Sequence, residues 1–132
     1  MPASDNRDRP TCLLTFDVEE YFQIEAARSR IVKAGWDYWP SRVELGVEWL
    51  LEQLAEHDAR ATFFTLGWIA RRHPRMVRRI VEAGHELACH GDLHDRLHRL
   101  DPISFAADLR RARRSLEDAG GCAVRGYRAP TF

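Results

Sequence analysis

The stretch "LTFDVEEYF", from Leu14 to Phe22, joins an apolar run to a cluster of acids. Its first residues and the apolar ones just before them predict a buried β-strand over about residues 11–18. Three acids, Asp17, Glu19 and Glu20, then stand at the end of that strand. Because a buried carboxylate is costly without a cationic partner, this strand end predicts that the rest of the chain supplies a cation.

Short apolar runs and amphipathic segments alternate along the rest of the chain. Further strands are predicted over 60–66, 85–90 and 122–128, and helices over 41–57, 68–72, 74–83 and 101–119. Ser41 and Glu44 have the spacing of a capping box at the start of the first long helix. This alternation predicts an α/β fold whose parallel strands are buried on both faces, with the helices outside.

Composition limits the classes of protein. A chain of 132 residues with 45% apolar residues can form one domain, which we expect over 11–132 after a flexible segment 1–10. Twenty basic residues balance twenty acidic ones, so nothing in the net charge indicates nucleic acid. The arginine clusters at 71–79 and 110–114 are expected to lie on solvated helix faces.

Targeting signals and disulfides are not indicated. No apolar run approaches the roughly 18 residues of a membrane span, and the first residues lack an apolar signal segment, so the predicted location is cytoplasmic. The three cysteines, Cys12, Cys89 and Cys122, are odd in number and form no C-x-x-C pair. We expect them to be buried free thiols.

Polar residues gather where the predicted strands end, which is the edge that carries the chemistry in parallel α/β folds. Asp17 and Glu19 are two apart and so share one face of the first strand. His90 and His94 follow the third strand, and their spacing on a helical turn would place both imidazoles on one side. Arg128 ends the fourth strand.

These residues predict a hydrolytic metal site. Two histidines and one carboxylate would hold a divalent metal and leave one coordination position open, as catalytic sites require. Glu19, His90 and His94 would be the ligands, Asp17 would take a proton from the attacking water, and Arg128 would keep Asp17 ionised. The ligand set suits zinc most simply, and also cobalt, manganese or nickel.

Four motifs resemble one family. "LTFDVEEYF", "ATFFTLGWIA", "GHELACHGDLH" and "GYRAPTF" look, in this order, like the motifs of polysaccharide deacetylases of the NodB-homology type. The opening motif is most similar to the branch encoded with exosortase-linked exopolysaccharide systems. The resemblance covers about 11–132 and implies a distorted (β/α) barrel with fewer than eight strands. The reaction it implies is metal-dependent removal of acetyl groups from N-acetylated sugars.

The resemblance also implies roles for individual residues. Asp17 resembles the general base, His90 and His94 the metal-binding pair, and Arg128 the residue that orients the base. The backbone amide of Thr131 resembles the donor that stabilises the oxyanion. Substrate would be an N-acetylated polysaccharide or oligosaccharide.

The chain departs from the family pattern in two places. Many members carry a second Asp directly after the base, where this sequence has Val18. We therefore assign the carboxylate ligand to Glu19, with Glu20 as the alternative. The family also continues to a late histidine that resembles a general acid, whereas this chain ends at Phe132. We expect an N-terminal part of the catalytic domain, a partial barrel whose open strand edge favours self-association.

Two other functions remain open from the residues alone. A small-molecule amidohydrolase on the same scaffold would share these ligands. A non-catalytic carbohydrate-binding remnant would keep the aromatic residues Trp36, Tyr38 and Trp39, and its sugar binding would be indifferent to Asp17→Asn. The alternative interpretation of the aromatic segment 33–40 is a loop that covers the core. The remaining histidines, His57, His73, His85 and His98, are predicted to be structural or exposed.

Overall fold

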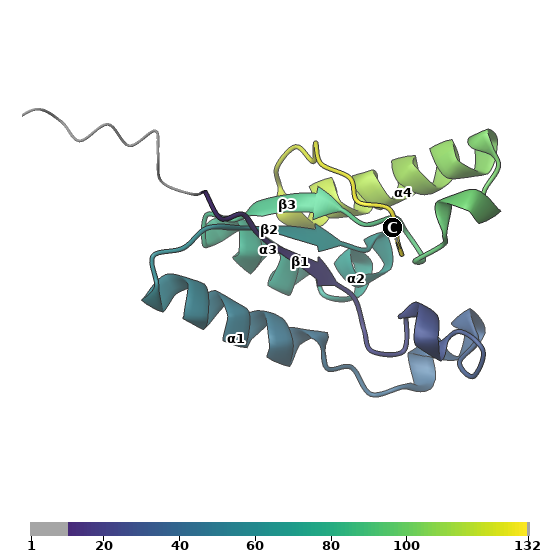
Figure 1. Cartoon of the computed structure of the whole chain (residues 1–132), viewed down its shortest axis with the longest axis horizontal. Helices are drawn as coiled ribbons and strands as arrows, with labels where there is room; N and C mark the ends of the chain where they lie inside the picture. Colours follow the sequence, from purple (N-terminus) through teal and green to yellow (C-terminus); the bar gives the residue numbers. More distant parts are fainter. Residues whose placement is uncertain (1–10, 132) are drawn as a thin grey trace, which may run out of the picture.

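Three parallel strands form the centre of the molecule. The computed structural model describes residues 11–131, so the flexible segment predicted over 1–10 lies outside the described residues. The strands are β1 (Leu14–Val18), β2 (Ala61–Thr65) and β3 (Glu86–Cys89), and they pair in the order β1-β2-β3. In Figure 1 all three arrowheads point to the same side of the molecule, where the marked C-terminus also lies.

Helices surround this sheet. The longer ones are α1 (Val43–Glu56), α2 (Gly67–Arg72), α3 (Pro74–Glu82) and α4 (Pro102–Gly120). Short 3-10 turns, η2 (Glu25–Ala27), η3 (Lys33–Tyr38) and η4 (Leu97–Arg99), lie in the connections. Figure 1 shows α1 along the β1 side and α4 along the β3 side. None of the helices within residues 11–131 combines the length and apolar character needed to cross a membrane.

The hydrophobic core lies on the helix-covered face of the sheet. Phe63 of β2 is completely buried there among side chains of all four helices, which include Val47, Ile69, Ile80 and Leu116. Asp101 caps α4 by accepting hydrogen bonds from the backbone N–H groups of Ile103 and Ser104, as its position before Pro102 predicts. The predicted order of strands and helices is thus confirmed for the first three strands.

The prediction that the strands are buried on both faces is wrong for β1 and only partly right for β2, whereas consecutive residues of β3 are buried. On the face opposite to Phe63, Phe64 of β2 is only partly buried and Thr15 of β1 is exposed. The described helices cover one face, and β1 forms an edge of the sheet. Exposure at that edge also corrects the prediction for Cys12, which is exposed, whereas Cys89 is buried and Cys122 is half-buried.

The fourth strand predicted over 122–128 is reduced to a single bridge. Only Tyr127 pairs with Cys89, in parallel. Cys89 N–H donates to the Gly126 carbonyl at 2.8 Å, and Arg128 N–H donates to the Cys89 carbonyl at 2.9 Å. Earlier in the segment the Val124 N–H donates to the Glu117 side chain of α4 instead of to β3. The remaining bridge still brings Arg128 to the edge of the sheet where the strands end.

Glu20 caps α1, which corrects the predicted capping box. Its side chain is 1% exposed and accepts hydrogen bonds from the Ser41 hydroxyl and from the backbone N–H groups of Arg42, at 3.0 Å, and Val43, at 3.4 Å. Glu44 lies instead 2.9 Å from His73 Nδ1. The unpaired N–H groups and the positive dipole end of a helix stabilise a carboxylate, so Glu20 needs no metal.

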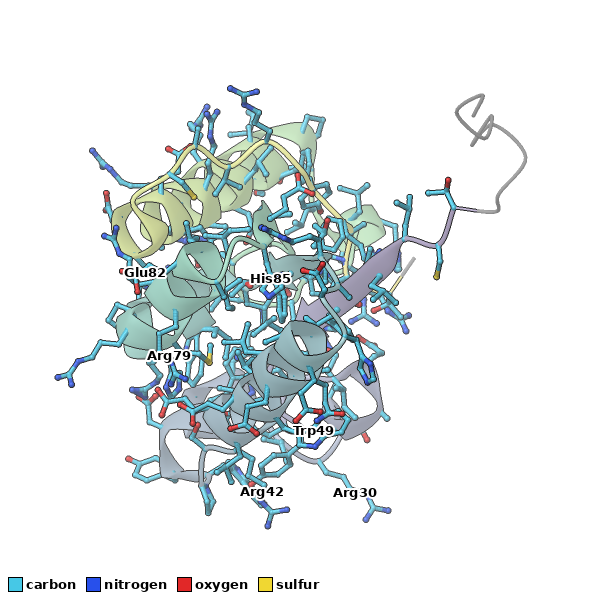
Figure 2. The ribbon with its side chains drawn as sticks, turned by 90° about the vertical axis from the view of Figure 1, so that its left-hand side faces the viewer. Arg30, Arg42, Trp49, Arg79, Glu82 and His85 are labelled. Atoms are coloured by element: carbon cyan, nitrogen blue, oxygen red, sulfur yellow. The ribbon has the colours of Figure 1, made fainter. Side chains whose placement is uncertain are left out.

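His85 lies at the opposite end of β3 from the strand tips. Figure 2 views the molecule from the end where the strands begin and labels His85 there, with Arg79 and Glu82 on α3 and Trp49 on α1. The imidazole packs against Phe63 with ring centroids 5.3 Å apart. Burial, together with the nearby Arg60, lowers the pKa of His85. This placement agrees with a structural role.

We predict that Glu20→Ala destabilises the fold, because it leaves the N–H groups of Arg42 and Val43 and the Ser41 hydroxyl without their acceptor. The expected loss is about 2 kcal/mol in the free energy of unfolding, measured by urea denaturation. Glu52→Ala, on the exposed face of the same helix, is the control and should change that free energy by less than about 0.5 kcal/mol. Equal stability of the two variants would contradict the capping role.

Candidate metal centre

Three side chains converge beyond the ends of β1 and β3. Ligand atoms of Glu19, His90 and His94 all lie within 4.8 Å of one another. Glu19 Oε2 is 2.7 Å from His94 Nε2 and 3.7 Å from His90 Nε2. Both histidines are buried, and the Glu19 side chain is 17% exposed. The predicted ligand set is therefore brought together, with Glu19 rather than Glu20 facing the histidines.

The chemistry of these donors fits a divalent cation. Glu19 Oε2 is buried yet accepts no hydrogen bond, even though His94 Nε2 lies close by. A buried carboxylate oxygen without a hydrogen bond calls for another cationic partner. His90 Nδ1 lies 2.9 Å from the Arg128 carbonyl, an arrangement that orients Nε2 toward Glu19. Burial lowers the pKa of His90 and so favours the neutral imidazole that binds metals.

A loop, not a helical turn, brings the two histidines together. Residues 90–94 have no helical assignment, and the imidazole centroids are 5.3 Å apart. Gly91 has φ 85° and His94 has φ 56°, both in the left-handed region. The spacing thus predicted correctly that the two imidazoles lie close together. It predicted wrongly that a helical turn brings them there. The left-handed conformations of Gly91 and His94 turn the chain so that the two imidazoles come close together. In a helix, the helical period would have had the same effect.

Asp17 is the fourth side chain of the site. Its Oδ2 lies 3.8 Å from His90 Nε2, so Asp17 and Glu19 face the same atom, as strand alternation predicts. Its Oδ1 accepts a hydrogen bond from Arg128 Nη1 at 2.8 Å. Arg128 is itself held, because its Nη2 donates to Thr15 Oγ1 at 2.8 Å and its guanidinium lies 4.0 Å from the centroid of the Phe64 ring.

Thr131 follows this cluster along the chain. Its φ is 55°, an uncommon conformation for a β-branched residue. The preceding Pro130 is buried, and its ring lies next to the position that a Cβ on Gly91 would take. The backbone at Thr131 is therefore held in a defined turn beside the loop of the two histidines. Its role as an oxyanion donor stays a prediction.

Asp92 is the site residue that the sequence analysis missed. Its side chain is 1% exposed, and both oxygens are paired. Arg71 Nη1 of α2 donates to Oδ1 at 2.7 Å, and Arg111 Nε of α4 donates to Oδ2 at 2.7 Å. The signal was its position between the two histidines in "HGDLH". Both arginines still have exposed side chains, 41% for Arg71 and 55% for Arg111, as expected for the arginine clusters, and their guanidinium groups also pair with Asp92.

The backbone around Asp92 is fixed to the same two helices. The carbonyls of Gly91 and Asp92 accept hydrogen bonds from the N–H groups of Gly67, at 3.0 Å, and Trp68, at 3.1 Å, at the start of α2. The Asp92 N–H donates to Asp108 Oδ2 of α4 at 3.1 Å. A Cβ on Gly67 would overlap with Asp92 Oδ1 and with the backbone of Ala112, so position 67 requires glycine. The loop is thereby positioned before any ligand binds.

The parallel α/β sheet carries two histidines and two acids at its strand ends, and three of these side chains form the donor set of a divalent-metal site. Residues 4–131 match the family model described as "Polysaccharide deacetylase". The chain belongs to the polysaccharide deacetylase family. Its fold is accordingly an α/β arrangement that corresponds to part of the family's barrel.

Individual relatives agree with this assignment. The chain is 35% identical over 82 residues to a chitooligosaccharide deacetylase of Bradyrhizobium, with 61% of this chain and 37% of that protein covered. A crystal structure from Mycobacterium smegmatis assigned to the polysaccharide deacetylases superposes with TM-score 0.74 at 35% identity, over 89% of this chain and 42% of the other. A CE4 family pseudoenzyme from Bacillus anthracis shares the fold, with TM-score 0.70 at 24% identity over 90% and 34%. The chain therefore spans less than half the length of each.

We predict that Asp92→Asn weakens both the fold and the metal site, because it removes the charge that two arginines contact. The expected loss is about 2 kcal/mol in the free energy of unfolding. Zinc affinity should fall about 10- to 100-fold, the usual effect of losing a residue that supports metal ligands. Urea denaturation and calorimetric titration measure the two quantities.

Asp118→Asn, an exposed acid on α4, is the matched control and should leave both quantities unchanged. An Asp92→Asn protein with normal zinc affinity would show that the loop is positioned without this carboxylate.

Proposed function

We propose that this chain carries the metal-binding and proton-accepting residues of a hydrolase that removes N-acetyl groups from an amino-sugar polysaccharide. One observation supports this most strongly: the paired Asp17 and Arg128 lie directly beside the Glu19, His90 and His94 cluster. A base beside a cation site, at the strand ends of a parallel sheet, is what amide hydrolysis by water requires. The named activity of the rhizobial relative agrees with it.

The cation would be a divalent metal held by Glu19, His90 and His94, most simply zinc, with cobalt, manganese or nickel as alternatives. When bound, it would supply positive charge that polarises the acetyl carbonyl and makes a water molecule more acidic.

Side chains of this protein would transfer the proton of the attacking water. Asp17 would accept it from the attacking water while Arg128 holds Asp17 Oδ1 in place. As the C–N bond breaks, acetate leaves and the sugar nitrogen needs a proton, which Asp17 would return. The Thr131 amide would donate a hydrogen bond to the oxygen that gains negative charge.

The proposed substrate is an N-acetylated polysaccharide or oligosaccharide. The resemblance of the opening motif to the exosortase-linked branch supports a role in exopolysaccharide synthesis. The names of the relatives, which include a peptidoglycan-N-acetylglucosamine deacetylase of Bacillus cereus, agree on an N-acetylated amino sugar as the reacting unit.

We predict that the chain binds one zinc ion by calorimetric titration, and that Glu19→Ala and the double variant His90→Ala, His94→Ala abolish this binding. The zinc-loaded chain should release acetate from N-acetylated chito-oligosaccharides. Asp17→Asn should reduce acetate release at least about 100-fold, because it removes the base. The same variant should bind zinc as the unmodified chain does.

Each outcome has a distinct meaning. If the folded chain binds no zinc, the metal centre is wrong. If zinc binds and no acetate is released, the deacetylase proposal is wrong for this chain. If the chain binds sugars but releases no acetate, and Asp17→Asn leaves that binding unchanged, the carbohydrate-binding alternative is correct.

A further inference from the structure

A groove of about 670 Å³ lies between α4 and the junction of α2 with α3. The helices α2 and α4 come close together at Gly67 and Ala112, where a Cβ on the glycine would overlap with the alanine backbone. About one helical turn further along, Arg71 Nη1 of α2 donates a hydrogen bond to Ser115 Oγ of α4 at 2.9 Å. Both of these residues line the groove, and its described lining includes none of the three candidate metal ligands. The groove is therefore separate from the candidate metal centre.

Positive charge dominates the described lining of this groove. The lining carries one carboxylate, that of Asp118, and four guanidinium groups, those of Arg71, Arg110, Arg111 and Arg114. Arg71 and Arg111 both pair with Asp92, which has a single negative charge to offer them. The groove therefore has an excess of positive charge, which attracts an anion.

Two of these arginines have no partner within residues 11–131. Arg110 and Arg114 are exposed, and they make no hydrogen bond, ion pair or cation–π contact with the described residues. The adjacent Arg113 shows the contrast, because its Nε donates to Glu117, four residues further on, at 2.9 Å. Residues four apart on a helix lie on the same face, so Arg110 and Arg114 present two like charges to the groove. An anion between them would remove their repulsion.

The other two arginines are already held in place. Asp92 accepts hydrogen bonds from Arg71 Nη1 and from Arg111 Nε, each at 2.7 Å. A guanidinium has five N–H donors, so both arginines keep donors for a second acceptor. Side chains that are ordered in advance lose less entropy when a ligand binds. This pair thus forms a prearranged part of an anion site.

The composition of the lining favours a diphosphate among anions. Guanidinium groups bind phosphate oxygens through paired hydrogen bonds, and four of them suit two linked phosphoryl groups better than a single carboxylate. Small apolar residues, Ala70, Pro74 and Ala119, complete the lining and leave room for the group that carries the diphosphate. Sites for small molecules have volumes of about 300 to 1,000 Å³, and this groove lies within that range.

We propose that this groove binds a small molecule that carries a diphosphate group. Arg110 and Arg114 would contact one phosphoryl group, and Arg71 and Arg111 would contact the other. The inference goes beyond the proposed deacetylase function, because it concerns a second ligand and a different set of residues. It requires no metal at Glu19, His90 and His94.

The test is calorimetric titration of inorganic pyrophosphate into the purified chain without added metal, because pyrophosphate would itself bind zinc. At about 150 mM NaCl, where attraction between distant exposed charges is screened, we expect one binding site per chain. The double variant Arg110→Gln, Arg114→Gln should weaken this binding at least about 10-fold, since it removes two guanidinium groups that contact phosphate. Circular dichroism verifies that each variant is folded.

Arg30→Gln, Arg125→Gln is the matched control, because it removes the same charge from two exposed arginines that do not line the groove. Arg30 lies at the far end of the molecule from α4 (Figure 2). The control should bind pyrophosphate within about 2-fold of the unmodified chain. Equal weakening in both double variants would show general attraction of charge and overturn the site, as would a folded chain that binds no pyrophosphate. Zinc binding and acetate release test the proposed function separately, so the two proposals can fail independently.

Discussion

The buried carboxylate of Asp92 is the constraint on which the site depends. It lies between α2 and α4, where Arg71 and Arg111 supply the positive charge that its burial requires. The same residue anchors the short loop that carries His90 and His94. Two histidines on a loop would otherwise be free to separate, and the entropy of ordering them would weaken any metal site. Here the helices hold that loop through both the side chain and the backbone.

The three acids at the end of β1 have different partners, which explains how three carboxylates can lie so close together. Asp17 pairs with Arg128, Glu19 faces the two histidines, and Glu20 binds the first N–H groups of α1. Asp17 thus pairs with a guanidinium, and Glu20 lies at the positive end of a helix dipole. Glu19 keeps a buried oxygen without a hydrogen bond, which a bound metal would satisfy. Asp17 and Glu20 thus each have their own source of positive charge, whereas that of Glu19 would be the proposed metal.

The segment between β1 and α1 links the strand tip to the rest of the site. Its buried aromatic rings pack together and against Trp68 of α2, and its charged residues pair with the loop that follows His94. Tyr38 is 88% exposed and Trp39 is 44% exposed, so the aromatic residues of this segment divide between core and surface. Trp36 covers the core as expected from the sequence, and it also lines a cavity beside His94.

The sequence by itself determined the type and order of the main elements, because helix and strand periodicities are local properties of the chain. It also identified Asp17, Glu19, His90, His94 and Arg128, since polar residues that follow apolar strands stand out without a structure. Only the tertiary structure decided that Glu20 binds the start of α1, because Glu20 meets the Arg42 N–H across a long stretch of chain. It also revealed Asp92 and reduced the fourth strand to one bridge. These outcomes depend on contacts between distant segments, which periodicity does not encode.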